Sequence, residues 1–269
     1  MNHNLTRTQK VAFAAMILGV YVIATRLVGL IQPAPVFSFN RIGIGIPLIA
    51  FASIFLGPLY GVIVGVAGDA LGWVFLGTWT GAFNVFLSVY YAIIGVVPWL
   101  LHRFLGKLLN GKHSAKAALV AVGVLFVAFM VVLWASDAFA SGFARWNVDP
   151  ILGKAVVSGV SAVSFGLTIA GLIVLEKRNA RDDNLGEVVW MAIIIEAITI
   201  VLKPLAFYLY CWVFIGQDIS VAWNISYGTL VLISILFSFV DVFITAAFLR
   251  LFLWIGRSRV KSGGSHESD

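Results

Sequence analysis

The stretch that decides the fold runs from Arg41 to Leu76 and reads RIGIGIPLIAFASIFLGPLYGVIVGVAGDALGWVFL. After Arg41, its only charged side chain is that of Asp69. A membrane-spanning helix needs about 20 apolar residues, each adding about 1.5 Å of length. The stretch divides at Gly57-Pro58 into two apolar segments, 42–58 and 59–76, which are short for two full spans. We expect two membrane helices here. Because both are short, the alternative that one of them is re-entrant stays open.

The rest of the chain continues in the same way. Hydrophobic residues make up 61% of the 269 residues and charged residues 11%, whereas a soluble domain has about 25% charged residues. The composition therefore predicts an all-α, polytopic membrane helix bundle rather than a soluble domain. About eight transmembrane helices are expected, in the segments 11–31, 42–58, 59–76, 82–101, 117–135, 152–175, 187–215 and 227–255. They form a single transmembrane domain, 1–258, followed by a disordered cytoplasmic tail, 259–269.

Basic residues set the orientation of these segments. They are concentrated before the first segment, in the loops 102–116 and 176–186, and after the last segment. The positive-inside rule then places both termini in the cytoplasm of a multi-pass protein of the bacterial cytoplasmic (inner) membrane. The first apolar segment has no clear cleavage site and is expected to be a retained helix. Because the net charge of +6 is spread over short loops, we expect no nucleic-acid partner.

Motifs for catalysis are missing from the sequence. The four histidines fall in the tails or in the loop 102–116, and no zinc-protease, serine-hydrolase or paired-acid metal motif is present. The glycines from Gly61 to Gly68 lack the Lys-Ser/Thr of a nucleotide-binding loop. The single cysteine, Cys211, excludes an intrachain disulfide. We therefore expect no enzymatic activity, no metal and no cofactor.

Four ionisable residues fall inside apolar segments, where a charge costs several kcal/mol. They are Asp69, Glu196, Lys203 and Asp241. Glu196 and Lys203 are seven residues apart and share one side of a helix, which Pro204 is expected to kink. Two interpretations stay open for these residues: they pair with neighbouring helices to hold the bundle together, or they contact a ligand or a proton.

Small residues recur at helical spacing in two places. Ala12, Ala15 and Gly19 share one face of the first segment. A second set, of glycines only, runs through the third segment: Gly57, Gly61, Gly65, Gly68 and Gly72. Such faces allow close packing of helices, either inside the bundle or against another protein, and the intramolecular case is the commoner one.

Aromatic and polar side chains gather at the expected outer ends of the segments. They are Arg41, Trp73, Trp79, Asn84, Trp223 and Asn224. Tryptophan at a membrane surface is an ordinary bilayer anchor. The same residue types around a turn also suit a pocket for a flat ligand with polar edges.

The stretch 41–74 resembles the substrate-binding S components of energy-coupling factor (ECF) vitamin transporters, most closely the folate-type branch. The residues that carry the resemblance are Pro47, Gly57-Pro58, Gly61, Gly65 and Asp69. The resemblance implies a six-helix membrane subunit that binds a vitamin-like small molecule at its outer face. It also implies a transmembrane coupling protein and two cytoplasmic ATPases as partners, with Ala12, Ala15 and Gly19 at the interface with the coupling protein.

The eight expected spans exceed the six of the family. Two explanations stay open: 117–175 is an inserted hairpin, or the chain is a diverged relative with a different partner. The sequence thus predicts the substrate-binding subunit of an ECF-type transporter for a vitamin, with a folate-like compound as the first candidate. Arg41 would meet a ligand carboxylate, and Trp73, Trp79, Asn84, Trp223 and Asn224 would contact its ring. Two alternatives stay open: a self-sufficient proton-coupled transporter that uses the four intramembrane ionisable residues, and a structural membrane protein of the cell envelope.

Overall fold

In the computed structural model, residues 5–31, 45–76, 83–106, 112–135, 143–144, 148–178, 185–218, 220 and 227–263 are described. The regular structure of these residues is helical throughout, with no strand among them. The helices are α1 (Arg7–Ile31), α2 (Gly45–Leu56), α3 (Pro58–Leu76), α4 (Val85–Leu105), α5 (Lys112–Ala135), α7 (Pro150–Arg178), α8 (Leu185–Tyr210) and α10 (Tyr227–Gly263). A π-helix, η3 (Cys211–Ile215), continues α8.

Six of these helices are long and apolar enough to cross a membrane: α1, α3, α4, α5, α7 and α8 together with η3. The chain is therefore a multi-pass helical membrane protein, and the predicted all-α membrane bundle is confirmed. Each of the eight predicted segments corresponds to a helix. Because α10 continues to Gly263, residues 259–263 are helical, and the prediction of a disordered tail is wrong for these five residues. Residues 264–269 lie outside the described part.

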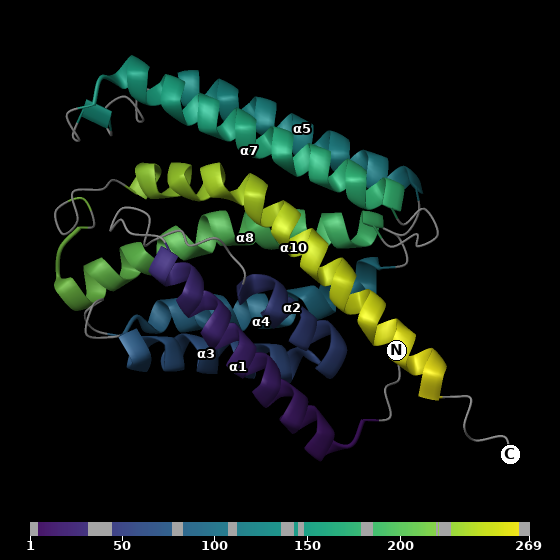
Figure 1. Cartoon of the computed structure of the whole chain (residues 1–269). Coiled ribbons are helices and arrows are strands. Elements are labelled where there is room, and N and C mark those ends of the chain that lie inside the picture. Colours follow the sequence, from purple (N-terminus) through teal and green to yellow (C-terminus); the bar gives the residue numbers. More distant parts are fainter. Residues whose placement is uncertain are drawn as a thin grey trace, which may run out of the picture.

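The helices form layers (Figure 1). Helices α5 and α7 lie side by side at one edge, α8 and α10 follow, and α1 to α4 lie on the far side of these two. Phe126 of α5 stacks on Phe165 of α7 at 4.3 Å between ring centroids, and both rings contact Phe239 of α10. The segment 117–175, predicted as an inserted hairpin, thus corresponds to the edge layer of the bundle.

Several pairs of packed helices run in opposite directions. Helix α4 begins beside the end of α8, where Asn84 bonds the carbonyl oxygen of Ala206, and ends beside its start, where His102 contacts Glu187. Helices α3 and α4 are antiparallel as well, as are α5 and α7. The described start of α1 and the end of α10 lie toward the same side of the molecule (Figure 1).

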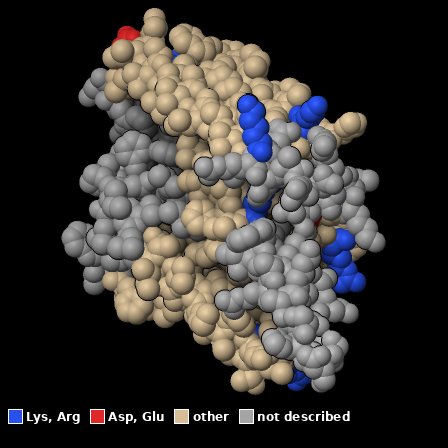
Figure 2. Space-filling view, turned by 45° about the vertical axis from the view of Figure 1, so that its right-hand side comes forward, with Lys and Arg blue, Asp and Glu red and all other residues tan. Residues whose placement is uncertain are grey.

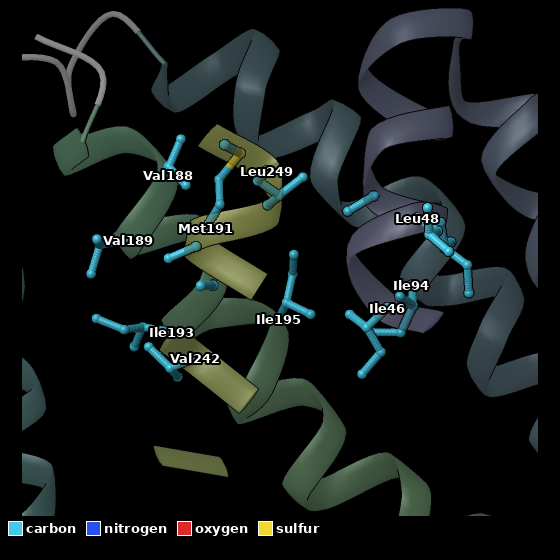
Figure 3. Close-up of a cluster of buried hydrophobic side chains, with 14 of the residues drawn as sticks. Ile46, Leu48, Ile94, Val188, Val189, Met191, Ile193, Ile195, Val242 and Leu249 are labelled. Atoms are coloured by element: carbon cyan, nitrogen blue, oxygen red, sulfur yellow. The ribbon is translucent and has the colours of Figure 1, made fainter. Parts of the chain in front are cut away.

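Helix α2 is the most enclosed element. Of its 12 residues 10 are buried, and it packs against α1, α3, α4 and α10. It ends at Leu56, and the next residue, Gly57, has a φ of 114°. Glycine adopts this backbone conformation readily, whereas other residues would be strained in it. Pro58 then starts α3, where its missing N–H leaves no hydrogen bond unmade. Figure 3 shows two groups of buried side chains. Ile46, Leu48 and Ile94 come from α2 and α4, and Met191, Ile195, Val242 and Leu249 come from α8 and α10.

The glycines of α3 pack inside the bundle. A Cβ atom on Gly61 would meet the backbone oxygen of Gly95 in α4 and the Cβ of Ser53 in α2. A Cβ atom on Gly65 would lie 2.8 Å from the backbone oxygen of Tyr91. Helices α3 and α4 therefore cross at backbone contact, and the intramolecular interpretation is confirmed for Gly61 and Gly65, whereas a Cβ atom on Gly57 would have nothing within 4 Å.

The described surface is mostly apolar. On the face in Figure 2 nearly all described residues are uncharged, and most of the visible Lys and Arg atoms lie in the right-hand half of the view. Large apolar side chains such as Phe75, Phe104 and Ile151 are exposed in the isolated chain. In a bilayer such side chains contact lipid, so this surface agrees with the membrane assignment.

Candidate functional site

A polar cluster lies between α1, α3 and α4, within otherwise apolar helices. Asp69 of α3 accepts a hydrogen bond of 2.7 Å at Oδ2 from the Ser88 hydroxyl of α4. Tyr21 of α1 is buried, is hydrogen-bonded to Tyr91 of α4, and lies near the Asp69 carboxyl. We call these four residues, Tyr21, Asp69, Ser88 and Tyr91, the Asp69 cluster.

Glycine makes room for this cluster. A Cβ atom on Gly68 would overlap the ring of Tyr21, and one on Gly45 would lie 2.6 Å from the same ring. The tyrosine therefore reaches between α2 and α3 because both helices present a glycine there. Its hydroxyl can then meet polar groups of two other helices instead of lipid.

Polar groups continue from the Asp69 cluster across α4 to α8. Tyr90 lies next to Tyr91 in α4, with 4.9 Å between the ring centroids, and its hydroxyl is 3.0 Å from Oγ1 of Thr199 in α8. Thr199 also donates to the carbonyl oxygen of Ile195. The adjacent residues Tyr90 and Tyr91 of α4 thus form hydrogen bonds with two different helices, α8 and α1. Hydroxyl groups in this way connect the two sides of the bundle.

An aromatic side chain lies beyond the Asp69 cluster, toward the end of α3. Trp73 follows Asp69 by one helical turn, is 38% exposed, and meets the ring of Phe83 edge to face at 5.7 Å. A half-exposed indole above a carboxylate and two tyrosines combines a stacking surface with hydrogen-bonding groups. This combination suits a flat molecule with polar edges.

Asn84 has a structural role that the sequence did not reveal. Its Oδ1 accepts from the backbone N–H groups of Phe86 and Leu87 at 3.1 and 3.4 Å and so caps the start of α4. Its Nδ2 donates to the carbonyl oxygen of Ala206 in α8 at 3.4 Å. Its contact with a ligand stays a prediction. Four further predicted site residues lie outside the described part of the chain: Arg41, Trp79, Trp223 and Asn224.

The other intramembrane charges lie at the contact between α8 and α10. Glu196 and Asp241 are 3% and 8% exposed. The charges that interact electrostatically with Glu196 are those of Asp241 and Lys203. One expectation was a partner on a neighbouring helix. On α10 the structure places a second acid, Asp241, near Glu196. Asp69 belongs to the separate cluster with Ser88, so the four residues do not form one group.

A buried pair of ionisable groups escaped the sequence interpretation. His102, predicted to be a loop residue, lies in the last turn of α4, and its Nδ1 is 2.5 Å from Oε1 of Glu187. The Glu187 side chain is 2% exposed and lies in the first turn of α8. An acid at the start of a helix and a base at the end of another are both favoured by the helix dipoles. An acid at the start of one predicted helix and a histidine at the end of another was the sequence signal that could have predicted this contact.

The small-residue face of α1 is open in the isolated chain. Ala12, Ala15 and Gly19 are exposed, and a Cβ atom on Gly19 would have nothing within 4 Å. Met16 and Val20 beside them are exposed too. In contrast to the glycine face of α3, no described residue of the bundle covers this face.

Among the described residues, no group of three or more His, Cys, Asp or Glu side chains is placed to hold a metal ion. Comparison of the chain with protein-family models, with curated proteins and with solved structures gave no match.

Proposed function

We propose that this protein is the substrate-binding membrane subunit of an ECF-type transporter that takes up a vitamin or a related small molecule. The observation that carries the proposal is the Asp69 cluster with Trp73 beside it. Hydrogen-bonding groups of three helices converge there inside apolar spans. Polar groups are costly to bury in a membrane, so those found there often bind a solute or an ion. The sequence resemblance in the stretch 41–74 supports the same function.

The proposal includes eight spans with both termini in the cytoplasm. The antiparallel neighbours and the positions of the basic residues support this topology. It assigns the Asp69 cluster to the outer half of the bilayer, because α3 then runs outward and α4 inward. Trp73 is nearer the surface than Asp69, as a first contact for a solute from outside must be.

Each side chain has a defined task in this proposal. The Asp69 carboxylate accepts hydrogen bonds from ring N–H or amino groups of the ligand, and Tyr21 and Tyr91 present hydroxyl groups. Trp73 stacks on the ring. Arg41 meets a carboxylate of a folate-like ligand. The aromatic and amide groups of Trp79, Asn84, Trp223 and Asn224, at the expected outer ends of the spans, complete the contacts.

Asp69→Asn is expected to weaken binding of the ligand by more than tenfold, since a hydrogen bond to a charged group contributes about 1.5–3 kcal/mol. Trp73→Ala is expected to weaken it by a similar factor through lost stacking. The measurement is a thermal-shift screen of the purified protein with folate, pantothenate, riboflavin, thiamine and biotin, followed by tryptophan quenching with the compound that stabilises it.

The matched control is Trp134→Ala in α5, at the edge of the bundle, which is expected to leave affinity unchanged. Unchanged affinity in both Asp69→Asn and Trp73→Ala contradicts the proposed site. A screen without any stabilising compound favours the structural alternative. Uptake by the protein alone that stops with an uncoupler favours the proton-coupled alternative.

The partners are a transmembrane coupling protein and two cytoplasmic ATPases, which supply the energy. The open face of α1 supports the contact with the coupling protein, because small residues let another helix approach closely.

Gly19→Val is expected to lower uptake by at least tenfold in cells that contain the ATPases, while ligand affinity and melting temperature of the isolated protein stay unchanged. The physical reason is that valine fills the open face without touching the bundle. Uptake and ligand affinity are measured on the same variant, and Gly166→Val, also in open space but on α7, is the control. Normal uptake with Gly19→Val excludes this face as the interface.

A further inference from the structure

Two acids, Glu196 of α8 and Asp241 of α10, are buried in the apolar interior where these helices meet, and their charges interact. Glu196 is 3% exposed and Asp241 is 8% exposed. The Oε1 atom of Glu196 has no hydrogen-bond partner. One turn from Asp241 on α10, Thr245 is fully buried and its hydroxyl has no hydrogen-bond partner either. The contact is therefore polar and incompletely hydrogen-bonded, although it is closed to water.

The charges at this contact do not balance. If all groups are ionised, two carboxylates face the single ammonium of Lys203, which lies on α8 two turns beyond Glu196. The sum is one negative charge, in a place where an unbalanced charge costs several kcal/mol. A single bound proton removes it.

The other helices that pack on α8 bring no second cation to this level. Helix α4 contributes Tyr90, whose hydroxyl is bonded to Thr199. The ionisable residues of α5 are confined to its beginning: Lys112, His113 and Lys116. Helix α10 has Arg250 more than two turns away from Asp241, at the level of Glu187 in the antiparallel register. Helices α2 and α7 also pack on α10; α2 has no ionisable residue, and those of α7 lie toward its ends: Lys154, Glu176, Lys177 and Arg178. Among these groups, Lys203 is the base that acts on Glu196.

We propose that the contact between α8 and α10 is a binding site for one proton, which Glu196 and Asp241 share. Glu196 is the principal carrier, because it is the more buried acid and one of its oxygens meets no donor. In the protonated state one carboxyl is neutral and the other is balanced by Lys203. Loss of the proton leaves one negative charge between two helices whose neighbouring residues, such as Ala192 and Ala246, are apolar and fully buried.

The consequence is that the α8–α10 contact is stable only while the proton is bound. This inference does not rest on the proposed uptake function, since it concerns a different contact from the Asp69 cluster and holds for any solute. Two interacting acids titrate as a pair, so the proton belongs to the site rather than to one residue alone.

The test is infrared spectroscopy of the full-length protein in lipid nanodiscs, with difference spectra between wild type and variants at neutral pH. We expect the wild type to contain a carbonyl stretch of a protonated carboxylic acid. Both Glu196→Gln and Asp241→Asn are expected to abolish it, because the remaining acid is then balanced by Lys203. Lys203→Met is expected to increase it, because both acids then need a proton. Asp218→Asn, at an exposed acid, is the control and leaves it unchanged.

Thermal denaturation provides a second readout. A folded state that binds a proton which the unfolded state releases becomes less stable as the pH rises. The slope of the melting temperature against pH in the alkaline range is thus expected to be negative in wild type and reduced in Glu196→Gln. Difference spectra in which both variants lose an ionised carboxylate, instead of a protonated acid, overturn the proposal. So does stabilisation of wild type by Na⁺, but not by choline, that Glu196→Gln removes.

Discussion

Valine at position 61 is expected to prevent the bundle from folding. A Cβ atom there meets the backbone oxygen of Gly95 and lies 2.7 Å from the Cβ of Ser53. Backbone atoms of α4 and the short α2 cannot move aside as a flexible side chain does. Overpacking costs about 1–3 kcal/mol where the neighbours can adjust, and more where they cannot. We expect Gly61→Val to fall at or beyond the upper end of this range.

The measurement is the yield of monodisperse protein in detergent and its melting temperature. Gly19→Val is the matched control, because it adds the same side chain to a helix glycine with open space around it. Gly95→Ala is expected to destabilise too, since its Cβ would lie 2.5 Å from the backbone nitrogen of Val62. A Gly61→Val protein with the melting temperature of wild type would show that α3 and α4 do not cross at backbone contact.

His102→Ala is expected to destabilise the protein by about 1–3 kcal/mol, because it removes the hydrogen-bond partner of a buried polar group. The loss leaves the Glu187 carboxyl, which is 2% exposed, without this hydrogen-bond partner. The reverse change, Glu187→Gln, is expected to cost less, because the His102 side chain is 26% exposed and a histidine can adopt its neutral form. The two partners of one contact thus have unequal effects.

This asymmetry has a direct test in denaturation of the two single variants and the double variant. His102→Ala with Glu187→Gln is expected to be more stable than His102→Ala alone, since glutamine leaves no buried carboxyl without its partner. Purely additive losses contradict a direct contact between the two side chains and assign the effect of His102 to packing. Arg103→Ala is the control, because that exposed neighbour contacts the ring of Trp99 and not Glu187.

The helices were largely predictable from the sequence, and their contacts were not. Long apolar segments broken at Gly57-Pro58 or by polar loops leave little choice of structure in a membrane, because the backbone must satisfy its own hydrogen bonds there. The end of α10 was misjudged because residues 259–263, although polar and glycine-containing, extend a helix that is already formed. The number of spans and their orientation remain predictions.

The candidate site was predictable in part for a similar reason. A carboxylate inside an apolar segment, such as Asp69 or Glu196, stands out in any sequence. Its partners do not, because Ser88 and Tyr21 are common residue types whose role depends on how helices far apart in the chain are aligned. Asn84 was recognised as polar, but its capping of α4 depends on backbone geometry. His102 escaped notice because a helix end and a loop look alike in sequence.

The enclosed position of α2 has a consequence for biogenesis. With 12 residues and a length of about 18 Å, this helix is shorter than the hydrocarbon layer of about 30 Å, so it is a poor substrate for independent membrane insertion. It is synthesised early, yet one of the helices that enclose it, α10, leaves the ribosome after α1 to α8. Nascent chains therefore carry an unfinished interior until α10 is made. Truncation after α8 removes the helix that completes it and exposes the chain to quality-control proteolysis.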